Sequence, residues 1–414
     1  MVPETTPTPA SLNEAVSRQY ETVALVLQGG GALGSYQAGV YEGLAEAGIH
    51  PNWVAGISIG ALNTAIIAGN APEKRVDALK QFWTTICKPA SSLSFWPAEL
   101  ETGLFGLSDG YRQAFSAWYA TRALMDGQSG FFTPRFPPPV GPRSLKVAEA
   151  SYYDTTALKA TLERFADFDR INDHDSMRVS VGAANVATGN LKFFHNGKND
   201  KPLKPEHFMA SGALPPGFPA VEVEGEFFWD GGLISNTPLS EILGQTPRRD
   251  TLAFQVDLWS AQGKLPSDMG QVDGRAKDIQ YSSRTRAVTD NMRHAQLLRR
   301  TLREVLRHVS AEALDHDPWC KIAAHMSTDK RYNVVQLIYK DKPYENQFKD
   351  FQFGYNTMLD HWSTGLADIR ETLAHPEWLD LPQNEAGFAS RDVHAPSSSD
   401  RLGPKTRAER EAGV

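Results

Sequence analysis

Residues 23–70 decide the fold, and they read VALVLQGGGALGSYQAGVYEGLAEAGIHPNWVAGISIGALNTAIIAGN. The apolar run at 23–27 predicts a buried parallel strand that leads into three glycines at 29–31. Apolar residues at helical spacing follow up to about Ala47, and a second apolar run at 53–55 leads into GISIG and a helix of small residues. This order of strand, glycine loop, helix, strand, turn and helix is typical of an α/β fold with a parallel sheet.

The GISIG segment has the G-x-S-x-G pattern of a nucleophile elbow, with Ser58 at its centre. Such a turn is so tight that bulky neighbours would clash, which accounts for Gly56 and Gly60. Neighbouring parallel strands end at the same edge of a sheet, so we expect Ser58 to face the glycine loop. Ser58 is therefore predicted to be a nucleophile at the start of a helix.

The glycine loop fits two functions. The backbone N–H groups of Gly29, Gly30 and Gly31 are unobstructed by side chains and could stabilise an oxyanion on a tetrahedral intermediate. Gly29, Gly31 and Gly34 also satisfy the dinucleotide fingerprint G-x-G-x-x-G. That fingerprint needs an acidic residue at the end of the second strand, and the segment HPNWVA at 50–55 contains none. No Gly-Lys-Ser/Thr follows the loop, so it also fails as a phosphate-binding P-loop, and we favour the oxyanion function.

A third motif consists of Asp230, Gly231 and Gly232, and it follows a short apolar run in the segment FMASGALPPGFPAVEVEGEFFWDGGLISNTPL. The combination of GGGALG, GISIG and DGG resembles the patatin-like phospholipase family, and the resemblance covers about residues 21–245. It implies a three-layer α/β/α hydrolase domain with a central, mostly parallel sheet. In this chain a mostly helical C-terminal extension is expected to follow.

The resemblance also implies the chemistry. Members of the family are serine esterases of lipid degradation, acting as phospholipase A, lysophospholipase or lipid acyl hydrolase. By this resemblance Ser58 is the nucleophile, Asp230 is the general base that accepts its proton, and the glycine loop is the oxyanion hole. No metal and no cofactor are expected.

A Ser-His-Asp triad is the alternative in which a histidine is the base. The chain has 11 histidines, but none after Asp230 lies in a predicted strand-end loop with supporting glycines. His294 and His308, for example, lie on a predicted long helix. The Ser–Asp dyad implied by the family remains the expectation, and close geometry with partial desolvation must help a carboxylate whose ordinary pKa is near 4.

The first motif departs from the family at two positions. Many members have Asp before the glycines and Arg within the loop, whereas this chain has Gln28 and Leu33 there. The second replacement removes a cation near the cleft, so a preference for anionic head groups is not implied.

Two other functions stay open. One is hydrolysis of short hydroxyalkanoate esters or thioesters, because the motifs do not fix the length of the acyl group. The other is a non-catalytic scaffold that binds a membrane or a partner through an arginine-rich helix.

Composition limits the remaining classes. Net charge is 42 − 49 = −7, which argues against nucleic acid as a partner. Cys87 and Cys320 are too few and too far apart for a disulfide framework, so free thiols are expected.

The N-terminal residues lack the features of a signal peptide and no apolar run reaches about 18 residues, so the expected location is cytoplasmic, peripheral to the membrane at most. A lipid or other ester is the expected substrate, with peripheral membrane contact and homo-oligomer formation as further options.

The composition changes along the chain and predicts its organisation. We expect a mobile segment at 1–20, the hydrolase domain at 21–260, a cap or loop insertion at 88–143, the helical extension at 275–378 and a disordered tail at 385–414. The last strand of the main sheet is expected near 251–258, although YNVVQLIY further on is also strand-like.

Two sets of residues in these regions have a distinctive composition. The cap contains apolar residues expected near the cleft, namely Phe95, Trp96, Leu104, Phe105, Phe131 and Phe132. A helix of roughly 30 residues is predicted from one apolar stripe, Val288, Met292, Ala295, Leu298, Leu302, Val305 and Val309. Its other face is expected to carry Arg293, Arg299, Arg300, Arg303 and Arg307. Such a face fits a solvated surface or, alternatively, contact with anionic lipid.

Overall fold

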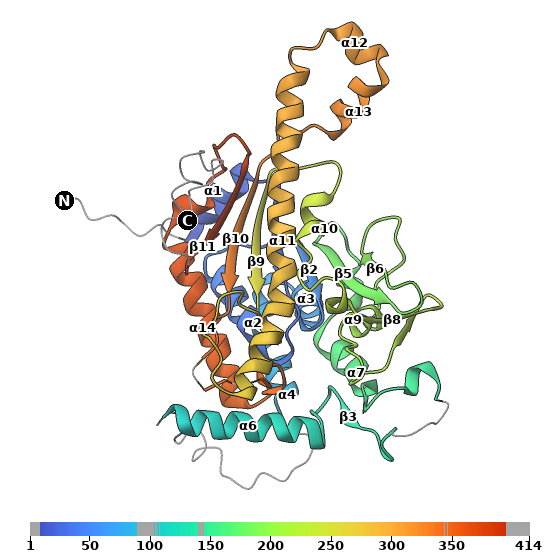
Figure 1. The fold of residues 1–414 in the computed structure, drawn as a ribbon, viewed down its shortest axis with the longest axis vertical. Coiled ribbons are helices and arrows are strands. Elements are labelled where there is room, and N and C mark those ends of the chain that lie inside the picture. The colour runs from blue at the N-terminus through green and yellow to red at the C-terminus, as the bar shows by residue number, and fades with distance from the viewer. Residues whose placement is uncertain are drawn as a thin grey trace, which may run out of the picture.

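The protein consists of one large mixed sheet with helices on both faces (Figure 1). The computed structural model describes residues 9–88, 103, 106, 108–139, 145–342, 344, 345 and 347–394. The three-layer α/β fold with a mostly parallel central sheet that the sequence predicted is confirmed.

The strands of the main sheet run in the order β11-β10-β9-β1-β2-β5-β8-β7, and β6 pairs with β5. All neighbours from β11 to β5 are parallel, whereas β5 pairs antiparallel with β6 and β8, and β8 pairs antiparallel with β7. The bounds are β1 Thr22–Leu27, β2 Trp53–Ile57, β5 Arg178–Asn185, β6 Leu191–His195, β7 Val221–Val223, β8 Glu226–Asp230, β9 Thr251–Asp257, β10 Tyr332–Ile338 and β11 Phe388–Asp392. A separate antiparallel pair is formed by β3 (Thr133–Pro134) and β4 (Tyr153–Asp154).

Strand β1 lies at the centre of the parallel part, and its apolar run is buried along its whole length. Leu27 at its end is in register with Gly56 of β2 and with Val256 of β9. The segments that follow these three strands therefore leave the sheet at the same edge. One of them is the glycine loop and another is the elbow with Ser58.

Alternate residues of β1 point into different cores. Leu25 and Leu27 belong to a core shared with the helices of one face, while Ala24 and Val26 belong to a core shared with the helices of the other face. The first face is covered by α1 (Pro9–Gln19), α2 (Gly34–Glu46), α3 (Ile59–Ala68), α4 (Arg75–Ile86) and α14 (Tyr355–Leu373). The second is covered by α10 (Leu239–Gly244) and α11 (Met269–Leu306).

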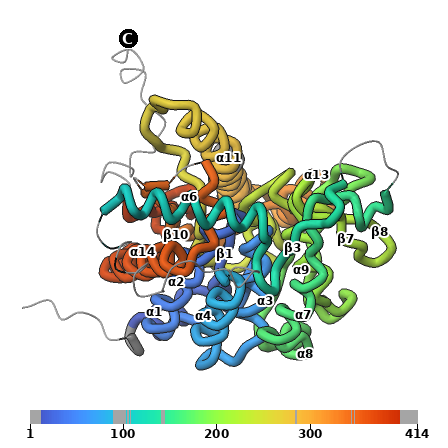
Figure 2. The backbone as a smooth tube through the Cα atoms, turned by 90° about the horizontal axis from the view of Figure 1, so that it is seen from below, coloured from blue at the N-terminus to red at the C-terminus, as the bar shows by residue number. Residues whose placement is uncertain are grey.

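Six further α-helices belong to the described part of the chain. They are α6 (Asp109–Asp126), α7 (Thr156–Phe165), α8 (Phe168–Ile171), α9 (Pro205–Ser211), α12 (Ala311–His316) and α13 (Pro318–Met326). Figure 2 shows α6 crossing the sheet edge, and Figure 1 shows α12 and α13 projecting at the opposite end of the molecule. Cys87 and Cys320 are free thiols, as expected. Among the described helices, none is long and apolar enough to cross a membrane.

The sheet does not end at β9, and here the prediction was wrong. Strand β9 pairs with β1 on one side and with β10 on the other, and β11 then pairs with β10. The expected disorder from residue 385 onward is also wrong for β11, where Phe388 is buried. The sequence of β11, FASRD, is mostly polar because an edge strand buries little, so its composition resembled that of a tail.

The N-terminal segment is likewise more ordered than predicted. Helix α1 buries Leu12 and Val16 in the core, and Tyr20 follows it. The Tyr20 hydroxyl accepts a hydrogen bond from the Asn333 amide of β10 at 3.2 Å. The expectation of a mobile segment is therefore wrong from residue 9 onward.

Helix α11 is longer than predicted, with 38 residues, and its faces differ from those expected. Val288 and Met292 pack against the core, but Leu298 and Val305 are exposed. Arg300 donates hydrogen bonds to the backbone carbonyls of Glu385 and Asp329 at 2.8 and 3.1 Å, so it anchors the helix instead of facing solvent.

Helices α2 and α14 pack very closely because glycines lie at their crossing. A Cβ atom on Gly39 would lie 2.0 Å from the Trp362 carbonyl oxygen, and one on Gly365 would lie 2.1 Å from the Tyr36 carbonyl oxygen. The Tyr36 hydroxyl also donates a hydrogen bond to the Asp368 carboxylate at 2.7 Å. Helix α14 is thus packed directly on the helix that follows the glycine loop.

We expect Gly365→Ala to lower the free energy of unfolding by about 1–3 kcal/mol, because the added methyl group must push the two helices apart. Gly274→Ala in α11 is a matched control, since its Cβ would lie 3.6 Å or more from its neighbours. That change should be neutral or stabilising by up to about 1 kcal/mol. Urea unfolding of both variants decides this, and equal midpoints for Gly365→Ala and the wild type would contradict the close crossing.

Candidate active site

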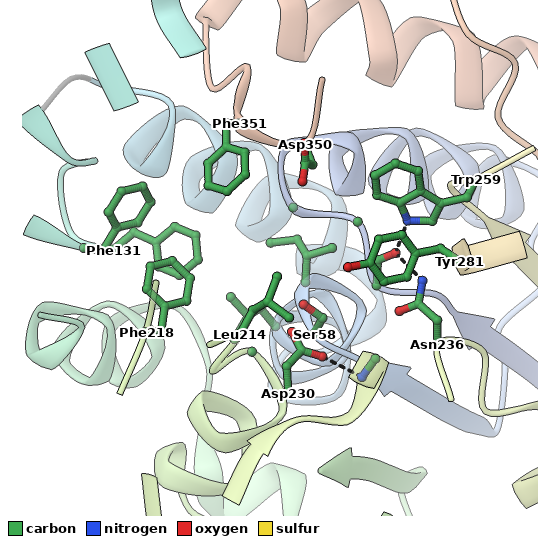
Figure 3. A pocket seen from close by; sticks show the side chains of 18 of the residues that line it. Ser58, Phe131, Leu214, Phe218, Asp230, Asn236, Trp259, Tyr281, Asp350 and Phe351 are labelled. Atoms are coloured by element: carbon green, nitrogen blue, oxygen red, sulfur yellow. Dashed lines mark hydrogen bonds between the residues drawn. The ribbon is translucent and has the colours of Figure 1, made fainter. Parts of the chain in front are cut away.

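Ser58 connects β2 to α3 in a strained turn. Its backbone has φ +56° and ψ −127°, a conformation that non-glycine residues rarely adopt. A Cβ atom on Gly56 would lie 2.4 Å from the Gly60 carbonyl oxygen, and one on Gly60 would lie 2.3 Å from the Leu27 carbonyl oxygen. The elbow can therefore form only with glycine on both sides, and it places the serine side chain in the pocket (Figure 3).

The Ser211 hydroxyl supports the elbow through hydrogen bonds, and sequence reasoning did not identify this residue. The Ser58 backbone N–H donates a hydrogen bond to the Ser211 hydroxyl at 3.0 Å, and that hydroxyl donates to the Gly182 carbonyl at 2.6 Å. Ser211 is fully buried at the end of α9. Its place in the FMASGALPP segment, which contributed to the family resemblance, was the available signal.

Asp230 ends β8 and reaches the pocket beside Ser58 (Figure 3). One of its carboxylate oxygens accepts a hydrogen bond from the Gly232 N–H at 2.7 Å. Burial raises the pKa of Asp230 to about 7, although hydrogen bonding to the Ser58 side chain and to the Gly232 amide lowers it in part. Near neutral pH this carboxylate therefore exists in both its acid and its base form.

The glycine loop offers two backbone donors to the pocket. Within the described part of the chain, no acceptor is hydrogen-bonded to the N–H groups of Gly30 or Gly31. The Gly29 N–H donates to the Asn236 carbonyl at 3.3 Å, so the expectation that all three glycines supply free amides does not hold for Gly29. The Gly29 carbonyl in turn accepts from the Asn236 side chain at 2.9 Å and from the Trp259 indole at 2.8 Å.

The hydrogen bonds of the Gln28 side chain account for the first departure from the family pattern, glutamine in place of aspartate before the glycines. Its side-chain oxygen accepts hydrogen bonds from the backbone N–H groups of Leu258 and Trp259, at 2.5 and 3.1 Å. Its amide nitrogen donates to the Thr285 hydroxyl of α11 at 3.2 Å. An aspartate could accept but not donate, so glutamine suits a position where the loop is fixed both to the segment that follows β9 and to α11.

The pocket around Ser58 has apolar walls and encloses about 680 Å³, its open mouth included. Phe131 and Phe132 of the predicted cap line it, as expected, whereas Phe95, Trp96, Leu104 and Phe105 lie outside the described residues. The remaining apolar lining comes from Ile59, Leu62, Leu214, Phe218, Trp259, Tyr281, Phe351 and Phe353. No histidine belongs to the lining that the structure describes, and His294 and His308 are exposed elsewhere.

The C-terminal region builds one wall of this pocket, which sequence reasoning did not foresee. The short 3-10 helix η5 (Lys349–Phe351) lies against the glycine loop, because a Cβ atom on Gly31 would be 2.3 Å from the Asp350 carbonyl oxygen. Two ion pairs fix this segment to α11: Lys277 with Asp350 at 3.0 Å, and buried Lys349 with Asp278 at 2.6 Å. Burial raises the pKa of Asp350, while Lys277 opposes that shift.

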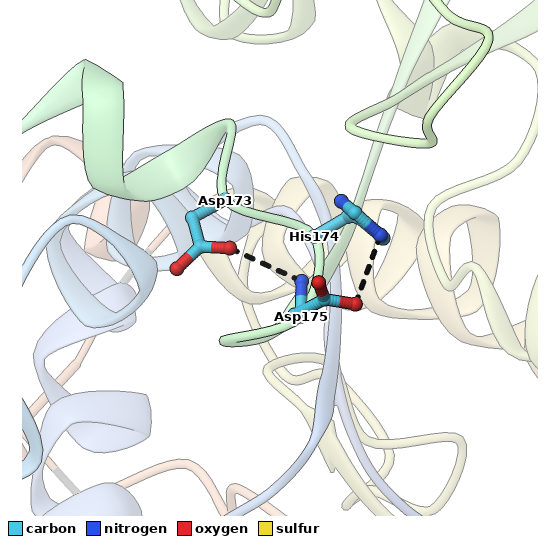
Figure 4. Close-up of side chains that lie close together, drawn as sticks. All are labelled: Asp173, His174 and Asp175. Atoms are coloured by element: carbon cyan, nitrogen blue, oxygen red, sulfur yellow. Dashed lines mark hydrogen bonds and ion pairs between the residues drawn. The ribbon is translucent and has the colours of Figure 1, made fainter.

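Among the described residues, one group of side chains is close enough together to hold a metal ion: Asp173, His174 and Asp175 (Figure 4). An Asp173 carboxylate oxygen accepts from the Asp175 N–H at 3.3 Å, and His174 lies 2.9 Å from the Asp175 carboxylate. The group precedes β5, at the edge of the sheet opposite to Ser58, so it takes no part in this pocket.

Two family models match segments of the chain. The family model for patatin-like phospholipases matches residues 25–243, and a second model, described as patatin phospholipase, matches residues 279–385. No curated protein matches the chain. VipD from Legionella pneumophila is a similar solved structure, with 15% identity over 83% of this chain and 67% of that chain and a TM-score of 0.32. Because the first model covers more than half of the sequence, the chain belongs to the patatin-like phospholipase family.

Proposed function

We propose that the protein is a serine hydrolase that cleaves carboxylic ester bonds of lipids through a Ser58–Asp230 dyad. The observation that carries this proposal is the pairing of a strained serine with a buried carboxylate in one apolar pocket. Membership of the patatin-like phospholipase family supports it.

The reaction is acyl transfer from an alcohol to water. The Ser58 oxygen attacks the ester carbonyl and its proton passes to Asp230, while the Gly30 and Gly31 amides stabilise the oxyanion. Protonated Asp230 then gives the proton to the leaving alcohol. In the second half Asp230 accepts a proton from water, which attacks the acyl group, and the proton returns to Ser58 as the fatty acid leaves.

The environment of Asp230 suits this task. A carboxylate with an ordinary pKa is a weak base at neutral pH, but a general base is most effective when its pKa is near the working pH. Burial, which raises the pKa of Asp230 to about 7, supplies this match without a histidine. The Gly232 amide fixes the orientation of the carboxylate.

The lining supports an uncharged, apolar acyl group as the substrate. No lysine or arginine belongs to the described lining, and Leu33, which stands where many members of the family carry Arg, is buried in the core. Among the described lining residues, the one charged group besides Asp230 is Asp350, an acid that is paired with Lys277. The part of the lining that the structure describes therefore offers no cation to an anionic head group.

The alternative functions are less well supported. A scaffold without activity would not need the strained backbone at Ser58 or a buried acid beside it. Short hydroxyalkanoate esters carry a hydroxyl group or a second ester, and the aromatic side chains along the pocket offer such polar groups few partners.

We expect Ser58→Ala to lower kcat/KM for ester hydrolysis by at least about 10³-fold, since the nucleophile is lost. Asp230→Asn should lower it by about 10²–10⁴-fold, because the amide cannot accept the serine proton. The asparagine oxygen can still accept the Gly232 N–H, so thermal unfolding should show both variants folded. Near-wild-type turnover of Asp230→Asn would rule out the dyad.

The activity should depend on the ionisation of Asp230. With a pKa of about 7, kcat/KM on a neutral ester should fall about tenfold per pH unit well below pH 7 and level off above about pH 8. Because the folded state holds this proton more tightly than the unfolded state, the stabilising effect of protonation is lost as the pH rises through about 7. The wild type should therefore lose stability relative to Asp230→Asn between about pH 5 and about pH 8.

Asp257 is a matched control for this pH profile. Burial also raises its pKa to about 7, and it accepts hydrogen bonds from Gln255 and Thr237, but it does not line the pocket. Asp257→Asn should leave the acidic limb of the activity profile in place. If Asp257→Asn abolished or shifted the acidic limb of the pH–activity profile and Asp230→Asn did not, the assignment of Asp230 as the base would be incorrect.

A chain-length series distinguishes the candidate substrates. With p-nitrophenyl esters we expect kcat/KM to rise from acetyl to medium-chain acyl groups, as each methylene buried in the pocket adds about 0.8 kcal/mol of binding. Micellar phospholipids should then be cleaved at the acyl ester. A maximum at C4 hydroxy esters or thioesters would favour the short-chain alternative.

A further inference from the structure

Helix α6 presents an uncharged, partly aromatic stripe to solvent. Tyr111, Trp118 and Met125 follow one another at intervals of seven residues, so they lie on one face of the helix. Their exposed fractions are 47%, 46% and 72%. Ala114 and Thr121, the exposed residues between them on this face, are also uncharged.

The charges of α6 are paired and do not interrupt this stripe. Arg112 forms an ion pair with Asp109 and lies over the Tyr344 ring, 5.7 Å from its centre. Arg122 is buried and donates a hydrogen bond to Asp126 at 3.0 Å. The described residues of the stripe itself, Tyr111 to Met125 at intervals of seven with Ala114 and Thr121 between them, therefore offer no charge to a partner.

The inner face of α6 covers the region of the candidate active site. Ser116, Ala120 and Ala123 are buried, and the helix packs against η5. The Tyr119 ring lies 2.7 Å from where a Cβ atom on Gly354 would be, next to the pocket residue Phe353. Figures 1 and 2 show α6 lying across the sheet edge at which β9 and β10 end.

Other apolar side chains, some exposed and some lining the pocket, follow α6 along the chain. Phe131 and Phe132, which line the pocket, lie five and six residues after the end of α6. Exposed apolar residues continue in the connection from α6 to α7, namely Phe136, Leu145, Val147 and Tyr152. The apolar surface and the mouth of the pocket thus occupy the same end of the molecule.

A second exposed apolar stripe provides a comparison. Trp319, Ile322 and Met326 lie on one face of α13, which projects from the opposite end of the molecule (Figure 1). A lipid bound there would be separated from Ser58 by the whole length of the sheet. The arginines of α11 beside β10 are equally remote, since Arg300 bonds to the segments that precede β10 and β11.

We propose that the outer face of α6 rests on a lipid surface and brings the mouth of the pocket to it, an inference that builds on the lipid ester hydrolysis proposed above. Tyrosine and tryptophan side chains favour the boundary between lipid and water, and Met125 can enter the acyl region. Because the stripe carries no charge, binding depends on apolar burial and is insensitive to salt.

The test uses the full chain with Ser58→Ala, so that vesicles stay intact, and vesicles of phosphatidylcholine alone. Tyr111→Ser, Trp118→Ser and Met125→Ser combined should lower the vesicle partition coefficient at least about tenfold, at low and high salt alike. The single change Met125→Asp should act in the same direction. The matched control, Trp319→Ser, Ile322→Ser and Met326→Ser combined, should bind like the parent protein.

The same two triple variants with Ser58 intact separate this inference from the proposed function. Both should hydrolyse a soluble short-chain ester at the wild-type rate, and only the α6 variant should lose activity on vesicle-bound esters. Undetectable binding of the parent, unchanged binding of the α6 variant, equal loss in the α13 variant, or a shift from dimer to monomer in the α6 variant would each overturn the docking inference. Absence of all ester hydrolysis would instead overturn the proposed function.

Discussion

The structure of the site depends on the hydrogen bonds that hold Gln28 and Gly29 in place at the end of β1. The Gln28 side chain joins the backbone of the segment that follows β9 to α11. Gly29 exchanges hydrogen bonds with Asn236 and accepts a third from Trp259. All of these partners are buried, where an unpaired polar group is costly, so the loop has one well-defined position. That position leaves Gly30 and Gly31 in the lining of the pocket, and no acceptor within the described part of the chain is hydrogen-bonded to their amides.

The two segments matched by family models form one structure. The first supplies the elbow, the acid and the glycine loop. The second supplies β10, which extends the same sheet, and α14, which packs on α2. Through η5 the second segment also reaches the glycine loop and forms a wall of the pocket. The buried ion pair of Lys349 with Asp278 connects this wall to α11. A substitution that breaks this pair, in α11 or in η5, should therefore displace the wall of the pocket.

Local patterns in the sequence predicted the part of the fold that is built from neighbouring residues. The strands and helices from β1 to α3 follow from apolar periodicity and glycine positions, and Ser58 follows from the geometry of the elbow. Asp230 was assigned by resemblance to the family, and the structure places it beside Ser58.

The features that could not be predicted all arise from contacts between distant segments. Strand β11 is polar and becomes a strand only because β10 provides its partner. The Gly29 N–H donates a hydrogen bond to the carbonyl of Asn236, more than 200 residues further along the chain, and no local pattern indicates this contact. The pairing of Asp350 with Lys277 and the outward-facing stripe of α6 likewise depend on which faces the tertiary structure covers.

The most direct test of the central claim is the rate and site of labelling by a fluorophosphonate, which reacts with an activated serine. Intact mass and peptide mapping should place one adduct on Ser58, and the labelling rate should fall at least about 10²-fold in Asp230→Asn while the Asp257→Asn rate stays close to that of the wild type. Labelling at another serine, or equal rates for Asp230→Asn and the wild type, would contradict a Ser58 nucleophile activated by Asp230.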